Sequence, residues 1–240
     1  MIEWDPTLDP NALVASIEHT LLAPTATEED VHRTCREART YGFAGVCVAP
    51  CWLRTVVEDL DGTAVRAVTV AGFPLGSTLS GAKAFETREA VARGADEIDV
   101  VANLGWIRQG RWEGVTADLM GVVAAADGRP VKAILETGPL DADAIRRGAA
   151  CAERAGVAYV KTSTGFLGGG ATVEVVRLLR QAVGDRLGVK ASGGIRTLDE
   201  ARRLLAAGAD RLGTSAGVAI AVEARGTGPS SPSRPDPGSR

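Results

Sequence analysis

The sequence predicts an α/β chain that folds as one domain, a (β/α)8 or TIM barrel. The 240 residues suit a single barrel, which typically needs roughly 250. Short, continuously apolar strand-like runs alternate with helical patterns along the chain, and strands that are apolar on both faces are typical of a parallel sheet. The hydrophobic fraction is 45% with 4% aromatic residues, which predicts a core of aliphatic side chains. An open doubly wound sheet is the alternative.

The expected strands come at a spacing that fits eight strand-helix pairs. We expect strands at residues 18–22, 45–50, 65–74, 97–103, 131–137, 159–164, 188–192 and 211–217. The expected helices are 13–17, one capped by Thr27, 52–60, 83–93, one that follows the fourth strand to about residue 126, 141–155, 173–183, and one that a capping box at 197–200 opens.

The predicted domain boundaries follow from composition. Residues 1–225 are expected to form the barrel domain. Residues 226–240 consist largely of Gly, Pro, Ser and Arg and have almost nothing to bury, so we expect a disordered tail there.

Charge and composition exclude several classes of protein. The net charge of −3 and the pI near 5.5 argue against nucleic acid or an anionic membrane as a partner. No apolar run reaches the roughly 20 residues that span a bilayer, and the first residues lack the basic and apolar regions of a signal peptide. We therefore expect a cytosolic location. Cys47 and Cys51 have no matching second pair of ligands, so no metal site is expected.

Lysine is rare in this chain, and three of the four lysines lie inside expected strands. Of 27 basic residues only Lys83, Lys132, Lys161 and Lys190 are lysines, which leaves 23 arginines. Arginine cannot release its proton in a protein, so a lysine retained against this bias indicates use of a titratable amine. The last three lysines are each 29 residues from the next, about one strand-helix unit, which predicts equivalent places on neighbouring strands.

Asp99 is expected to join these lysines inside the barrel, because alternate side chains of a strand share a face. Two ammonium groups on adjacent strands repel, and desolvation disfavours each charge, so at least one amine should have a lowered pKa. Such an amine can attack a carbonyl and form a Schiff base, while Asp99 stabilises charge or passes protons. The alternative is a lysine whose stem packs while its ammonium reaches water. The residues alone do not say which lysine is the nucleophile.

Glycines at the ends of the last two expected strands predict a phosphate site. Gly193 and Gly194 precede a helix, and Gly213 precedes Thr214 and Ser215. Loops after the seventh and eighth strands of such barrels often bind phosphate through backbone N–H groups, although an ordinary turn explains a single Gly-Gly equally well. The glycines at 168–170 could form a lid or only a linker.

The chain resembles deoxyribose-phosphate aldolase, a family of class I, Schiff-base aldolases. The resemblance covers nearly all of the expected folded region. It is carried by Ile17-Glu18-His19-Thr20-Leu21-Leu22, Glu97-Ile98-Asp99-Val100-Val101, Glu136-Thr137-Gly138, Lys161-Thr162-Ser163-Thr164-Gly165-Phe166, Lys190-Ala191-Ser192-Gly193-Gly194-Ile195-Arg196 and Gly213-Thr214-Ser215.

The resemblance implies an activity and a role for each matched residue. The family reversibly cleaves 2-deoxy-D-ribose 5-phosphate to D-glyceraldehyde 3-phosphate and acetaldehyde, in deoxyribonucleoside catabolism. Lys161 would be the Schiff-base nucleophile, Lys190 the lysine that lowers its pKa, and Asp99 the proton donor or acceptor. The phosphate would be held by Gly193, Gly194, Gly213 and Ser215, with Thr20 and Thr164 as further substrate contacts. No metal or cofactor is implied, and a homodimer or larger homo-oligomer is.

Some residues depart from the family pattern, and two other functions remain open. The family usually has Asp where Glu18 stands, and many members have Lys in place of Ala23. Some relatives end in a Tyr that reaches the site, but no Tyr follows Tyr159 here. One alternative function is a phosphate-binding isomerase that uses Glu136 or Asp99 as a base without a covalent step. The other is a non-catalytic barrel that senses a sugar phosphate.

Overall fold

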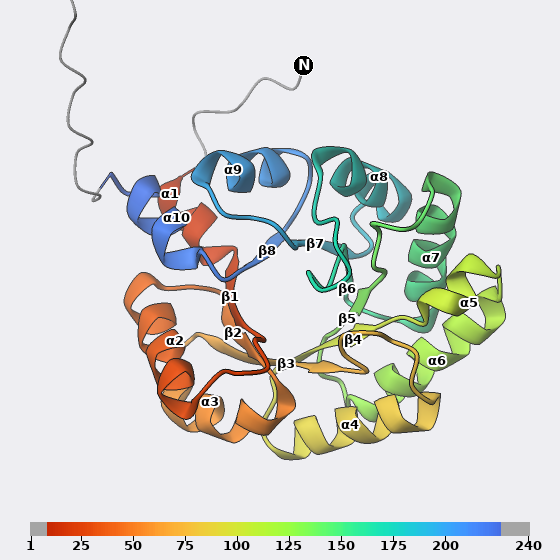
Figure 1. Ribbon diagram of the computed structural model, residues 1–240, viewed down its shortest axis with the longest axis horizontal. Helices are drawn as coiled ribbons and strands as arrows, with labels where there is room; N and C mark the ends of the chain where they lie inside the picture. The colour runs from red at the N-terminus through yellow and green to blue at the C-terminus, as the bar shows by residue number, and fades with distance from the viewer. Residues whose placement is uncertain (1–8, 227–240) are drawn as a thin grey trace, which may run out of the picture.

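The computed structural model describes residues 9–226, and within them eight parallel strands close a barrel inside a ring of helices (Figure 1). The tail predicted at 226–240 lies outside the described residues, apart from Gly226. The strands are β1 (Ile17–Leu21), β2 (Gly45–Val48), β3 (Arg66–Ala71), β4 (Glu97–Val101), β5 (Val131–Ile134), β6 (Tyr159–Lys161), β7 (Gly188–Ser192) and β8 (Arg211–Thr214).

The helices follow the strands and cover the outside of the barrel. They are α1 (Pro10–Ala15), α2 (Glu28–Tyr41), the 3₁₀ turn η1 (Pro50–Trp52), α3 (Leu53–Leu60), α4 (Ser80–Ala92), α5 (Leu104–Arg108), α6 (Trp112–Ala125), α7 (Ala142–Ala155), α8 (Val173–Val183), α9 (Leu198–Ala206) and α10 (Gly217–Ala224).

The closed barrel confirms the predicted fold class, and the open sheet is wrong. The strands pair in chain order, and β1 pairs in parallel with both β2 and β8, so the sheet has no edge. Helix α1 packs beside α10, where the chain enters and leaves the ring (Figure 1).

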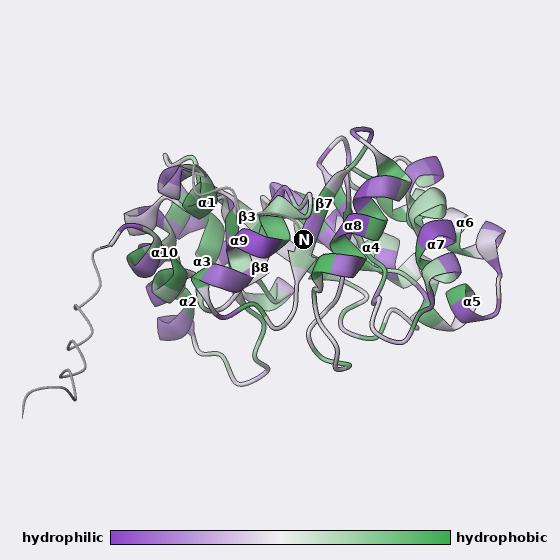
Figure 2. Ribbon diagram, turned by 90° about the horizontal axis from the view of Figure 1, so that it is seen from above, coloured by the Kyte–Doolittle hydropathy of each residue, from purple (hydrophilic) through white to green (hydrophobic). Residues whose placement is uncertain are grey.

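Aliphatic side chains fill the space between the strands and the helices, as the composition predicts. Strands β2, β4 and β5 are buried at every residue, because one face meets the helices and the other lines the barrel. The helices carry green apolar and purple polar stretches together (Figure 2), which is the pattern of helices that bury one face.

Both predicted helix caps are confirmed. The side chain of Thr27 accepts a hydrogen bond from the backbone N–H of Asp30, and the side chain of Asp30 accepts one from the backbone N–H of Thr27. Thr197 and Glu200 form the same reciprocal pair at the start of α9. These boxes satisfy N–H groups that the first turn of a helix leaves without partners.

The single helix predicted after the fourth strand is wrong, because the segment forms two helices, α5 and α6. Between them Gly110 has a φ of +69°, which reverses the chain and ends α5. A Val- and Ala-rich composition indicates helix but does not mark this turn.

The strands are shorter than predicted at their carboxyl ends. Residues 102–103, 135–137 and 162–164 leave the sheet, although β-branched and apolar residues continue the strand pattern there. These segments lie at the carboxyl end of the barrel, where the cavity described below opens.

No helix within residues 9–226 is both long and apolar enough to cross a bilayer.

Candidate active site

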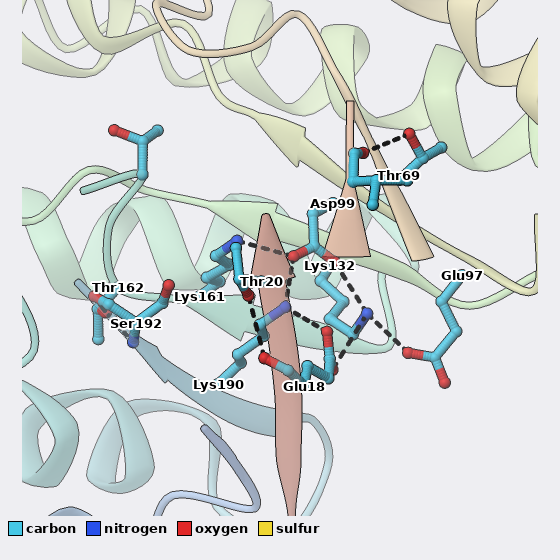
Figure 3. A network of polar contacts seen from close by, with 12 residues as sticks. Glu18, Thr20, Thr69, Glu97, Asp99, Lys132, Lys161, Thr162, Lys190 and Ser192 are labelled. Atoms are coloured by element: carbon cyan, nitrogen blue, oxygen red, sulfur yellow. Dashed lines mark hydrogen bonds and ion pairs between the residues drawn. The ribbon is translucent and has the colours of Figure 1, made fainter. Parts of the chain in front are cut away.

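All four lysines of the chain are buried. Lys83, Lys132 and Lys190 have 0% exposure and Lys161 has 2%. Three of them project into the barrel from the neighbouring strands β5, β6 and β7, and Asp99 reaches them from β4 (Figure 3). The structure therefore brings together the three residues that the sequence predicts to be catalytic.

Asp99 lies at the centre of this cluster. Its Oδ2 atom accepts hydrogen bonds from Lys161 Nζ at 2.8 Å and from Lys190 Nζ at 2.6 Å, while Oδ1 accepts one from Lys132 Nζ at 2.8 Å. Asp99 is itself fully buried. One carboxylate cannot neutralise three ammonium groups, and buried charges are stable only when they are paired.

Two glutamates supply the remaining negative charge. Lys132 forms ion pairs with Glu97 Oε2 at 2.6 Å and with Glu18 Oε1 at 3.4 Å, and the other oxygen of Glu18 contacts Lys190 Nζ (Figure 3). Lys161, by contrast, meets a single carboxylate oxygen among the described residues, and it shares that oxygen with Lys190.

The equal spacing of the three strand lysines predicts their positions only in part. Lys161 lies directly opposite Lys190 across β6 and β7. Lys132 lies opposite Tyr159 and not opposite Lys161, so the prediction of equivalent places is wrong for Lys132. The stagger between β5 and β6 places Lys132 two residues nearer the amino ends of the strands, where Glu97 can reach it.

Lys161 is the lysine whose amine is easiest to deprotonate. Burial disfavours its ammonium form and Lys190 repels it, and together these effects outweigh the attraction of Asp99, so the pKa of Lys161 is lowered. One lowered amine pKa is what the sequence predicts for lysines on adjacent strands.

The other two lysines of the cluster stay charged. Burial disfavours the ammonium forms of Lys132 and Lys190 as well, but Asp99 and Glu18 attract both, so the pKa of each is raised. Burial acts against the carboxylate of Asp99 too, yet the three lysines outweigh it and hold the pKa of Asp99 well below its usual value. The cluster thus contains two fixed cations and one amine that can become neutral.

A cavity of about 320 Å³ opens at the carboxyl ends of the strands, beside this cluster. The six residues that the sequence predicts to bind substrate or phosphate all line it, namely Thr20, Thr164, Gly193, Gly194, Gly213 and Ser215. Gly213 connects the cavity to the lysines, because a Cβ there would lie 3.0 Å from Cε of Lys190 and 2.8 Å from Oγ of Ser192.

The glycine segment 168–170 packs against the barrel ends. A Cβ on Gly170 would lie 2.5 Å from the carbonyl oxygen of Gly193, and the next residue, Ala171, donates its N–H to that oxygen at 3.0 Å. A Cβ on Gly138 would lie 3.2 Å from the carbonyl oxygen of Gly168. The glycines therefore allow the backbone segments at 138, 168–170 and 193 to lie close together, and Gly193 carries this packing to the cavity that it lines.

The two cysteines considered as metal ligands lie in different environments. Cys47 is fully buried on β2, and burial raises the pKa of its thiol to about 11, so the thiol is protonated at neutral pH. Cys51 is exposed. Within residues 9–226 no three His, Cys, Asp or Glu side chains are arranged to hold a metal ion.

Comparison with known proteins identifies the family. The model of the DeoC/LacD family aldolases matches residues 13–222. The chain belongs to this aldolase family.

Individual members of the DeoC/LacD family are similar over most of their length. Deoxyribose-phosphate aldolase 1 of Cutibacterium acnes is 50% identical over 212 residues, which are 88% of this chain and 98% of the relative. Deoxyribose-phosphate aldolase of Thermotoga maritima is 49% identical over 206 residues, covering 86% and 83%. The solved tetrameric deoxyribose phosphate aldolase of Aeropyrum pernix superposes with a TM-score of 0.85 at 35% identity, covering 91% of this chain and 93% of that one.

Two of the residues that depart from the family pattern lie in or beside the site. Glu18, where the resemblance implies Asp, spans from Lys190 to Lys132 with its two carboxylate oxygens, and Ala23 lines the cavity.

The sequence places Lys132 among the strand lysines that Asp99 joins, but it assigns Glu18 and Glu97 no place in the cluster. A signal was available, because Glu97 shares a strand face with Asp99, and Glu18 shares one with Thr20. Charged residues inside apolar strands of a closed barrel must meet partners there.

Proposed function

We propose that this aldolase reversibly cleaves 2-deoxy-D-ribose 5-phosphate into D-glyceraldehyde 3-phosphate and acetaldehyde, through a Schiff base on Lys161. The observation that carries the proposal is the buried Lys161 amine, whose pKa is lowered and which contacts a carboxylate shared with a second lysine. The names of the relatives in Cutibacterium acnes and Thermotoga maritima support the choice of substrate.

The covalent step needs a neutral amine. Lys161 Nζ adds to the C1 aldehyde of the open-chain sugar, and loss of water gives an iminium ion. The C2–C3 bond then breaks as the C3 hydroxyl loses its proton. The electrons of the C2–C3 bond flow into the iminium, which becomes an enamine, and glyceraldehyde 3-phosphate is released. Protonation at C2 and hydrolysis release acetaldehyde and return the free amine.

Asp99 and Lys190 are proposed to support these proton transfers. Lys190 Nζ donates to the same Asp99 oxygen as Lys161, so the pair can compensate charge that appears and disappears on Lys161. Asp99 can pass protons during dehydration of the carbinolamine and protonation of the enamine, directly or through water.

The phosphate is proposed to lie over the ends of β7 and β8, against Gly193, Gly194, Gly213 and Ser215. These residues line the same cavity, in the loops after the seventh and eighth strands that often bind phosphate in such barrels. Thr20 and Thr164 line it from other sides and would contact the rest of the substrate.

No contact favours the isomerase alternative. The carboxylate of Glu136 is bound to Thr164, and that of Asp99 to three lysines. Both oxygens of Asp99 are therefore engaged, and Glu136 does not line the cavity, so neither carboxylate is placed to act as the base of a non-covalent isomerisation.

Cleavage of deoxyribose 5-phosphate by the purified chain in the presence of a chelator tests the proposal. We expect glyceraldehyde 3-phosphate to form, measured with a coupled dehydrogenase, and Lys161→Arg to lower turnover by at least on the order of 10³-fold, because Arg keeps the charge but is no nucleophile. Absence of cleavage by the unaltered chain, or its loss on adding chelator, would overturn the proposal.

We propose a role in deoxyribonucleoside catabolism, a cytosolic location, and a homodimer or larger homo-oligomer. The tetramer of the relative from Aeropyrum pernix supports self-association. Light scattering of the purified chain would measure its mass. The boundary between a barrel domain at 1–225 and a tail at 226–240 remains a prediction.

A further inference from the structure

Glu136 is a buried residue that the proposed chemistry does not use. It lies two residues beyond β5 with 1% exposure, and its Oε1 atom is buried without a hydrogen-bond partner in the described part of the chain. Burying a carboxylate with an unpaired oxygen is unfavourable. Its retention therefore calls for a contact that offsets this cost.

The backbone of Glu136 is also unusual. Its φ is +52°, one of two positive values among the described residues other than glycine. Such a conformation costs of order 1 kcal/mol or more and persists only where the surroundings enforce it. Backbone strain of this kind clusters at functional sites.

The contact that Glu136 makes is with the turn that follows β6. Glu136 Oε2 accepts hydrogen bonds from the backbone N–H of Thr164 at 3.1 Å and from the Thr164 hydroxyl. The same hydroxyl oxygen accepts the N–H of Phe166 at 3.1 Å. One carboxylate oxygen thus fixes both ends of the turn 164–166.

This turn is one wall of the cavity, and Glu136 itself is not. Thr164, Gly165 and Phe166 line the cavity together with the glycines at 193–194 and 213, and Gly165 lies directly beside Gly193, since a Cβ on Gly165 would be 3.8 Å from Cα of Gly193. Phe166 further packs edge-to-face on Phe73, with ring centroids 5.2 Å apart. Glu136 can therefore affect a ligand only through the position of the wall.

The wall lies at the phosphate end of the cavity and not at the amine. The Lys161 side chain is held by Asp99, and its backbone by strand pairing with β5 and β7 and by the N–H of Leu135; the Glu136 side chain takes part in none of these contacts. Movement of the turn 164–166 would widen the space over Gly193 and Gly194 and leave Lys161 Nζ in place.

From these contacts we infer that Glu136 is a positioning residue that sets the preference for phosphorylated over unphosphorylated substrate, by holding the turn 164–166 against the phosphate end of the cavity. The inference rests on the proposed function, since it assumes that the phosphate lies over the ends of β7 and β8. It assigns Glu136 no proton transfer.

The test compares two variants with a matched control. Glu136→Gly removes the carboxylate and relieves the positive φ, and Glu136→Gln keeps a neutral acceptor of the same size. The control is Asp127→Gly, because Asp127 is the other non-glycine residue with positive φ, at +48°, and lies in the turn after α6, outside the cavity lining. It reports the effect of relaxing the backbone alone.

Two measurements separate specificity from chemistry. The first is the ratio of kcat/KM for deoxyribose 5-phosphate to kcat/KM for deoxyribose. The second is borohydride trapping of acetaldehyde on Lys161. We expect the ratio to fall about tenfold in Glu136→Gly, through KM of the phosphorylated substrate, because charge-assisted hydrogen bonds to the turn are lost. The fall should be smaller in Glu136→Gln and absent in Asp127→Gly, with trapping unchanged in all three.

An unchanged ratio in a folded Glu136→Gly variant would overturn the inference, and so would loss of trapping, which would place the effect at Lys161. If circular dichroism shows that Glu136→Gly is unfolded, the Glu136→Gln variant tests the inference through the same ratio of kcat/KM values for the two substrates.

A third readout does not depend on turnover. Inorganic phosphate should raise the melting temperature of the unaltered protein more than that of Glu136→Gly. Equal shifts, or no shift in either, would overturn the inference. Failure of the proposed function would appear differently, as absence of cleavage and trapping in the unaltered chain.

Discussion

At the scale of single residues, the three strand lysines differ in how many carboxylates they meet. Lys132 contacts three, Asp99, Glu97 and Glu18, and Lys190 contacts two of these. Lys161 contacts one, through an oxygen that it shares. The same burial therefore produces two stable ammonium groups and one amine with a lowered pKa.

Replacing Lys190 with Met should raise the pKa of Lys161. The repulsion from Lys190 disappears, and Asp99 Oδ2 is left to Lys161 alone. Because the reactive form is the neutral amine, activity is lost as pH falls through the pKa of Lys161. The acidic limb of the kcat/KM profile should therefore move to higher pH. Lys190→Arg, which keeps a cation, should shift the limb less. An unmoved limb in a folded Lys190→Met variant would contradict this description of the cluster.

The sequence predicts the reacting residues better than their surroundings. Alternation along a strand places Asp99, Lys161 and Lys190 inside the barrel, since it depends on a period of two alone. The position of Lys132 depends on the stagger between strands, and the reach of Glu18 depends on contacts between residues 114 to 172 positions apart in the chain. Neither can be read from a local pattern.

At the scale of elements, strand β8 leaves room for the lysine cluster because its Gly213 has no side chain. A Cβ on Gly213 would approach Oγ of Ser192 to 2.8 Å, closer than packed side chains allow, and Cε of Lys190 to 3.0 Å, a contact so tight that the lysine would have to move. The sequence predicts Gly213 as a phosphate ligand, and the structure adds that it leaves room for Lys190.

Gly213→Ala should therefore displace Lys190 from Asp99. We expect kcat to fall by about tenfold or more, because a displacement of about 1 Å in a catalytic contact can cost roughly 10²-fold, while the melting temperature changes little. Gly121→Ala is a matched control, since a Cβ there meets nothing within 4 Å. Wild-type kcat in Gly213→Ala would show that Lys190 tolerates the new methyl group.

Helices α4 and α6 are joined by a buried ion pair that has no place in the proposed chemistry. Lys83 Nζ donates to Asp118 Oδ2 at 2.6 Å and to the carbonyl oxygen of Val101, at the end of β4, at 2.8 Å. Both side chains are nearly inaccessible, at 0% and 2%. This pair ties two helices to the strand that carries Asp99.

Removing one partner should destabilise the fold strongly. Lys83→Met leaves the Asp118 carboxylate buried and unpaired, at a cost of about 3–5 kcal/mol in the free energy of unfolding. The double variant Lys83→Met with Asp118→Leu should recover most of that loss, because no buried charge remains. Urea unfolding measures both. A single variant that loses less than about 1 kcal/mol, or a double variant no more stable than the single, would contradict this role.

The positions of most helices and strands can be predicted from local sequence, but one break between helices and several strand ends cannot. Thr27 and Thr197 mark helix starts because their hydroxyls bind exposed N–H groups. Helical composition does not predict the break between α5 and α6, because the break depends on the conformation of one glycine, Gly110. The pattern overextends the strands because apolar or β-branched residues, such as Leu135, Thr137 and Thr162, continue after the sheet ends.

At the scale of the whole molecule, the barrel encloses three lysines and three carboxylates that form ion pairs with one another. These pairs form only when all of the contributing strands are in place. Strands β1, β4, β5, β6 and β7 each contribute to them, so local opening of any one strand would leave charges unpaired. The closed order of strands, predicted from their number and apolar character, is what brings residue 18 next to residue 190.

This arrangement predicts a loss of stability in acid. Burial acts against the carboxylates of Glu18 and Asp99, but the lysines hold both pKa values below their ordinary 4.5 and 3.8. The unfolded chain therefore takes up protons first, and the stability present above about pH 4.5 is lost as pH falls through the folded-state values.

The free energy of unfolding in urea should accordingly be lower at pH 3 than at pH 7. The difference should shrink in Glu18→Gln, which removes one of the two titrating groups, and should be unchanged in Glu58→Gln, whose side chain lies on the surface. Equal pH dependence in the Glu18→Gln variant and the unaltered protein would contradict the assignment.

The most direct test of the central claim is to trap the covalent intermediate. The purified protein is incubated with acetaldehyde and borohydride, digested, and the modified lysine is located by mass spectrometry. With four lysines in the chain, the position of the adduct is unambiguous. The cluster predicts a reduced two-carbon adduct on Lys161 and none on the other three. An adduct on Lys132 or Lys190 in place of Lys161, or no adduct at all, would contradict it.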